Sequence, residues 1–176
     1  MSSPLNLHAA PAAGFDQPFE MLEACHERVQ RMLRLLERLS VHLPVHGCDA
    51  QAASAARDVM RYFDSAAPAH HEDEERHVLP LLRAAGDEAF AAQIEQEHHE
   101  LHRQWAVLRR TLAEVVAGTW VGTGPAEFAP WQKYATLYRA HAAAEEAVAF
   151  PAARAALDAA ALAAMGREMA ERRGVV

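Results

Sequence analysis

The segment AHHEDEERHVLP, residues 69–80, places three histidines and four acidic residues directly before a short apolar run and a proline. The chain around it is rich in Ala, Leu, Glu and Arg, which favour helices. A helix face that meets only water has no need of histidines, and a buried face tolerates so many carboxylates only where something neutralises them. The segment therefore predicts a helix whose polar side chains belong either to a solvated surface or to a buried site.

Prolines, glycines and capping residues divide the rest of the chain. Four long helical segments and a tail helix are expected, with these limits: Pro18 to Pro44 and Gly47; Asp49 to Pro80, interrupted near Ser65 and Pro68; Gly86 and Asp87 to Gly118; about Ala126 to the residue before Pro151; and Asp158 onward. This pattern predicts an all-α fold, an up-down-up-down four-helix bundle with a short C-terminal helix. The 176 residues fit a single domain.

Each long segment carries an apolar stripe at helical spacing, and ligand-type side chains replace hydrophobic ones within every stripe. In chain order these side chains are His26, His70, Glu74, His98, His102, His141 and Glu145. The pattern His-x-x-x-Glu with a proline ten residues after the histidine occurs twice, ending at Pro80 and at Pro151. Residues four apart share one helix face, so each such pair can bind one metal ion or two adjacent ions.

Five imidazoles and two carboxylates suit iron, manganese, zinc or copper, and the absence of thiolates from the set disfavours an iron–sulfur cluster. Seven ligands exceed the roughly four that a tetrahedral zinc ion takes. Two six-coordinate ions that share the carboxylates and one oxygen atom as bridges would use the whole set and leave one position open. The pattern therefore predicts a binuclear centre that can bind a small ligand.

The same seven residues, in this order over four helices, resemble the hemerythrin-like HHE cation-binding family over about residues 15–155. The resemblance implies one domain over residues 1–176, with a short N-terminal arm and a C-terminal tail helix. It also implies two non-haem iron ions, bridged by an oxo or hydroxo group and by carboxylates, that bind dioxygen. The last motif departs from the oxygen-carrier pattern, because its carboxylate is a Glu four residues after His141 and not an Asp five residues after it. Sensing, iron handling and stress resistance are proposed for the branch with this form.

The leading functional hypothesis is a protein, not an enzyme, that binds or senses dioxygen or nitric oxide at a di-iron centre. A sensing role would require a separate signalling or redox partner protein. The alternatives are a di-iron enzyme with peroxidase or iron-centre repair activity, and iron storage or delivery.

Three acidic or histidine side chains near the motifs leave alternatives open. His71 and Glu75 also lie on a helical stripe, so the buried pair of that helix is either His70 with Glu74 or His71 with Glu75. The internal repeat favours His70 with Glu74, and His71 then becomes an additional or exchangeable ligand. Glu75 and Glu146 are expected to be solvated or to support the ligands.

A ferritin-like di-metal site is the rival interpretation, because Glu-x-x-His occurs at residues 23–26 and 95–98. It leaves three histidines of the buried stripes unused, so it is the weaker hypothesis.

Other partners and locations are disfavoured by composition. The net charge is -7 and no arginine cluster could follow a phosphate backbone, so nucleic acid is not expected as a partner. No apolar run approaches the roughly 18 residues of a membrane span, and no export signal is visible near the start. Two cysteines make no disulfide scaffold. A cytoplasmic protein is expected.

Overall fold

Helix α1 (Pro18–His46) begins and ends where the sequence predicts. Pro18 lies in its first turn, where a backbone N–H group would have no partner within the helix. Gly47 ends the helix with a φ of 65°, which residues other than glycine rarely adopt. The computed structural model describes residues 14–122 and 124–175, and every regular element among them is helical. Most of the predicted N-terminal arm lies outside the described residues.

The second rod consists of α2 (Ala50–Arg61), a π-helical turn η1 (Tyr62–Ala66), α3 (Ala67–His77) and α4 (Leu79–Ala84). Asp49 caps it, because its Oδ1 accepts a hydrogen bond from the Ala52 N–H at 2.8 Å. Helix α5 (Glu88–Ala117) forms the third rod and ends at Gly118, which has left-handed backbone angles.

The fourth rod follows a short 3-10 turn, η2 (Pro125–Phe128). It consists of α6 (Ala129–Ala144), a π-helical turn η3 (Glu145–Ala149) and α7 (Phe150–Ala155). The tail helix α8 (Ala159–Arg172) is capped by Asp158, whose Oδ1 accepts from the Ala161 N–H at 2.8 Å. It packs against α1 and α3.

Pro80 and Pro151 do not end their rods, contrary to the sequence prediction. Each lies in the first turn of a further short helix, α4 or α7. The two π-helical turns each end two residues before a proline, Pro68 or Pro151. A wider turn relieves the clash between a proline ring and the preceding turn, so the rod continues with its register shifted by one residue. Val148 follows Glu145 by three residues, a spacing that predicts an inward side chain, yet it is 48% exposed and Ala149 is buried in its place.

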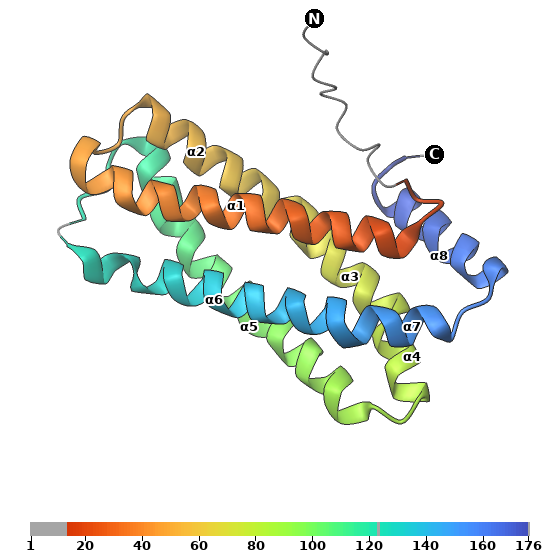
Figure 1. Ribbon diagram of the computed structural model, residues 1–176. Helices are drawn as coiled ribbons and strands as arrows, with labels where there is room; N and C mark the ends of the chain where they lie inside the picture. The colour runs from red at the N-terminus through yellow and green to blue at the C-terminus, as the bar shows by residue number, and fades with distance from the viewer. Residues whose placement is uncertain (1–13, 123, 176) are drawn as a thin grey trace, which may run out of the picture.

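Contacts join α1 to α2, α2 to α5, α5 to α6 and α6 to α1, so the four rods enclose one interior (Figure 1). That interior holds two apolar clusters. One includes Val29, Phe63, Leu101 and Tyr138, and the other includes Leu22, Val78, Ile94 and Ala149. On every rod, the buried polar stripe residues lie between a member of one cluster and a member of the other, so they form a polar layer between two apolar ones. Among the described helices, none is long and apolar enough to cross a membrane.

Candidate metal centre

Six of the seven predicted site residues lie together in the polar layer, each no more than 2% exposed. They are His26, His70, Glu74, His98, His141 and Glu145. The Nε2 atoms of the four histidines and both oxygens of each glutamate are buried without a partner in hydrogen-bonding geometry. Buried polar groups are normally satisfied, and eight such atoms in one layer would be costly if left alone. The layer therefore fits a cation that accepts imidazole and carboxylate donors.

Each of the two glutamates reaches histidines on both sides of the layer. Glu74 places Oε1 3.1 Å from His70 Nε2 and Oε2 3.4 Å from His98 Nε2. Glu145 places Oε2 3.1 Å from His26 Nε2 and Oε1 3.2 Å from His141 Nε2. The two His-x-x-x-Glu motifs thus have the same internal contact, and each carboxylate spans two groups of imidazoles.

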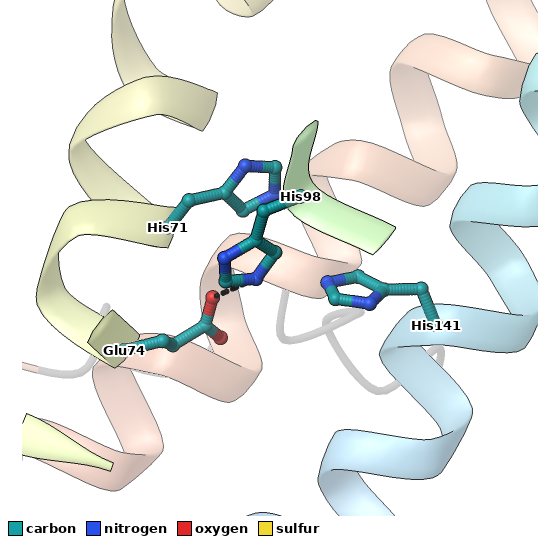
Figure 2. Close-up of side chains that lie close together, drawn as sticks. All are labelled: His71, Glu74, His98 and His141. Atoms are coloured by element: carbon teal, nitrogen blue, oxygen red, sulfur yellow. Dashed lines mark ion pairs between the residues drawn. The ribbon is translucent and has the colours of Figure 1, made fainter. Parts of the chain in front are cut away.

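Potential ligand atoms form two groups, within each of which all atoms lie within 4.8 Å of one another. One contains His26, His70, Glu74 and Glu145, and the other contains His71, Glu74, His98 and His141, shown in Figure 2. Glu74 belongs to both groups. This arrangement can hold two adjacent cations with a shared carboxylate, as the count of ligands predicts.

His102 is the predicted residue that the structure does not bring into the layer. Its side chain is exposed, and His71 occupies the corresponding place against His98, with the two rings stacked at 4.1 Å and 7°. His102 Nε2 lies 3.0 Å from His71 Nδ1, so it contacts the buried imidazole from outside. The Tyr138 hydroxyl lies 2.8 Å from the other nitrogen of His71, Nε2.

His70 and His71 are both fully buried, whereas helical spacing predicts that only one of the two faces inward. Adjacent residues differ by about 100° around a helix, and the inward arc of a helix is at least that wide. Glu74 is buried with them, whereas Glu75 is 39% exposed.

Outer carboxylates hold the far nitrogen, Nδ1, of three of these histidines. Glu146 lies 2.9 Å from His26 Nδ1, Glu75 lies 2.9 Å from His98 Nδ1, and Glu97 lies 2.9 Å from His141 Nδ1. Such contacts fix the ring and direct Nε2 toward a metal ion. The sequence suggested a supporting role for Glu75 and Glu146. Glu97 was missed, because it gives no periodic signal and its contact crosses from α5 to α6.

The buried carboxylates favour protonation of two of the histidines in the layer. Burial alone lowers the pKa of His98, but the carboxylates of Glu145, Glu74 and Glu75 outweigh it and raise that pKa to about 11. Burial also opposes the charge on His26, whose pKa Glu145 and Glu74 raise to about 9. Burial and neighbouring imidazolium groups keep the pKa of His70 and of His71 well below the usual value. A cation that enters the layer must therefore displace protons.

The two glutamates respond differently to the same surroundings. Burial and the nearby charge of Glu145 raise the pKa of Glu74. Burial pushes the pKa of Glu145 in the same direction, but His26 and His98 outweigh it and lower that pKa. The layer therefore retains negative charge for a cation to meet.

The ferritin-like alternative has no support in this geometry. Glu23 is exposed, and Glu95 binds Arg83 at 2.7 Å. Neither belongs to a buried ligand group. Cys25, next to His26 in the chain, is a buried free thiol whose pKa is raised by burial, and it also lies outside both groups.

Comparison with known proteins agrees with the geometry. A family model described as hemerythrin HHE cation binding domain matches residues 17–153. A protein of Haemophilus influenzae (strain ATCC 51907 / DSM 11121 / KW20 / Rd), described as uncharacterized, is 32% identical over 165 residues, which cover 93% of this chain and 94% of that protein. Helix α8 lies beyond the matched residues. The chain belongs to the hemerythrin HHE cation-binding domain family.

Proposed function

We propose that the polar layer would hold two iron ions, with Glu74 and Glu145 as the carboxylate ligands. His26 and His70 would bind one ion, and His71, His98 and His141 the other. The observation that carries this proposal is the set of eight unpartnered ligand atoms that fall into two groups sharing Glu74. We also propose that the four rods form the up-down-up-down bundle that the loop lengths predict.

The assignment of His71 as the fifth imidazole follows from how the histidine rings are held. An outer group contacts Nδ1 of His71, as it does for His26, His98 and His141, so Nε2 faces the layer. The Tyr138 hydroxyl now bonds to that Nε2 and would have to leave it when a cation binds. His102 then supports a ligand and is not itself one.

The function that this layer supports best is the binding or sensing of dioxygen or nitric oxide. Iron, when bound, supplies a redox-active position at which such a molecule can bind. The group with His26 and His70 offers one imidazole fewer than the other, so it would leave more room for such a molecule. Phe150 stacks on His26 at 5.4 Å and 14°, and both residues adjoin the apolar cluster that contains Leu22. Such surroundings exclude water and admit a small neutral molecule.

An enzyme is the second candidate, and the buried Tyr138 hydroxyl is the observation that favours it. An O–H group within hydrogen-bonding reach of the layer can donate a proton during peroxidase or repair chemistry. Iron storage or delivery, a cytoplasmic location and a separate signalling or redox partner remain predictions from the sequence.

Rapid mixing of the reduced, iron-loaded protein with dioxygen tests the proposal. A long-lived oxygenated species is expected for a binding protein. Immediate oxidation with consumption of added peroxide would support the enzyme instead. A single zinc ion in the purified chain would overturn the di-iron centre itself.

A further inference from the structure

A second group of metal-ligand side chains lies far from the polar layer, where α1 meets α2. His42 and His46 occupy the last turns of α1, four residues apart on one face, and Asp49 precedes α2. His26 and His42 are sixteen residues apart on one continuous helix, so this corner is about 24 Å from the layer along α1.

His42 and Asp49 are already in contact across the corner. His42 Nε2 lies 3.0 Å from Asp49 Oδ2, yet it is buried without a partner in hydrogen-bonding geometry. The capping bond to Ala52 uses the other oxygen, Oδ1, so Oδ2 faces His42 and takes no part in the cap.

The two imidazoles are spaced as the imidazoles of the buried layer are. The ring centres of His42 and His46 are 4.5 Å apart. The corresponding distances are 4.7 Å for His26 and His70, and 4.9 Å for His98 with His141. Those two pairs each fall within one ligand group, whereas the ligand atoms of His42, His46 and Asp49 do not all lie within 4.8 Å of one another, so His46 would have to turn for the three to share an ion.

We propose that His42, His46 and Asp49 form a surface site for one divalent transition-metal ion, separate from the buried centre. Imidazole with carboxylate suits zinc, nickel, copper or ferrous ions. His46 is exposed, so its side chain can rotate toward the His42–Asp49 pair as the ion binds. Arg38, one turn before His42, lines a surface hollow together with His42 and His46. Its positive charge limits the affinity of the site for a cation.

Zinc binding to the purified chain, with zinc and iron counted in the same dialysed samples, tests this site. Wild type should take up one zinc ion per chain beyond its buried metal, with no loss of iron. His42→Gln and His46→Gln should each weaken this binding about tenfold or more, since even the supporting partners of a metal site have effects of that size. Asp49→Asn should weaken it too, while asparagine preserves the helix cap.

Two further variants separate a metal site from general damage. Asp58→Asn removes an exposed carboxylate of α2 that pairs with Arg61, and it should leave zinc binding unchanged. Arg38→Ala should tighten binding, which a loss of structure would not do. Wild-type zinc uptake equal to that of a His42→Gln/His46→Gln double variant would overturn the proposal, as would an unaltered affinity in His46→Gln.

Discussion

His102 Nε2 lies 3.0 Å from Nδ1 of His71, so an exposed imidazole holds a buried one in place. This relationship reverses the roles that helical spacing alone assigns, because spacing makes His102 the ligand and His71 an accessory. Three other histidines of the layer receive the same outer support from carboxylates.

His70→Ala and His71→Ala should each strip or cripple the iron site, whereas His102→Ala should retain most of the iron and release it about 10–100-fold more readily. Iron content after gel filtration, with and without a competing chelator, measures both effects. His99→Ala, an exposed neighbour in α5, is the matched control and should behave as wild type. Full iron content in His71→Ala with an empty site in His102→Ala would restore the assignment from spacing.

Glu97→Gln should weaken iron binding, because Glu97 holds the Nδ1 atom of His141 at 2.9 Å from a neighbouring helix. Loss of such an outer partner typically costs about 10–100-fold in metal affinity. Chelator-driven release of iron, followed over time, gives the comparison with wild type. Glu114→Gln, at an exposed position of the same helix, should have no effect. Equal release rates in both variants would mean that Glu97 is only a surface residue.

The metal-free protein should be most stable near pH 6.5, the usual pKa of histidine. Below pH 6.5, His70 and His71 are protonated in the unfolded chain but stay neutral in the folded chain, where their pKa values are low. The free energy of unfolding therefore decreases with falling pH. Above pH 6.5, the stability that protonated His26 contributes is lost as the pH rises toward its folded pKa of about 9. The stability that protonated His98 contributes is lost in the same way, as the pH rises toward its folded pKa of about 11.

The iron-loaded protein should show the opposite trend above pH 6.5, because metal binding requires deprotonated histidines. Thermal unfolding of both forms between about pH 5.5 and pH 9 makes the comparison. Parallel curves would contradict the proton exchange argued above.

Iron should raise the unfolding temperature of wild type but not of Glu145→Ala. A ligand that binds only the folded state adds stability by mass action, and the variant lacks one of the two buried carboxylates of the layer. Thermal unfolding of wild type and of Glu145→Ala, each with and without iron, gives the four unfolding temperatures to compare. If all four coincide, the polar layer does not bind metal.

Breaking the contact between α8 and α3 should destabilise the whole chain. Asp73 is fully buried, and its carboxylate binds both Arg172 and Arg173, the latter at 2.5 Å. Arg172→Ala with Arg173→Ala leaves that charge alone, which should cost about 3–5 kcal/mol in urea unfolding. Arg167→Ala, exposed on the same helix, should change stability by less than about 0.5 kcal/mol.

Periodicity predicts much of this molecule because the helices are long and regular. The stripe at helical spacing on α1 is buried along its length, at Leu22, His26, Val29, Leu33 and Leu36. The prediction fails where the backbone leaves the α register, as at Val148 within the π-helical turn η3. It fails again where two adjacent residues both face inward, as His70 and His71 do, because a single stripe cannot express that. Contacts between rods, such as that of Glu97 with His141, cannot be predicted from the residue spacing of either helix.

The polar layer also bears on how cooperatively the chain folds. It separates the apolar cluster around Phe63 from the one around Phe150. The inward-facing nitrogen and oxygen atoms of its six predicted residues have no hydrogen-bond partners. A bound pair of cations would join the two clusters into one unit, since its ligands would come from all four rods. Without it, each cluster becomes a separate foldon that can open while the other stays closed. The metal would then set how many pieces the bundle melts in, and a single unfolding free energy would describe only the loaded form.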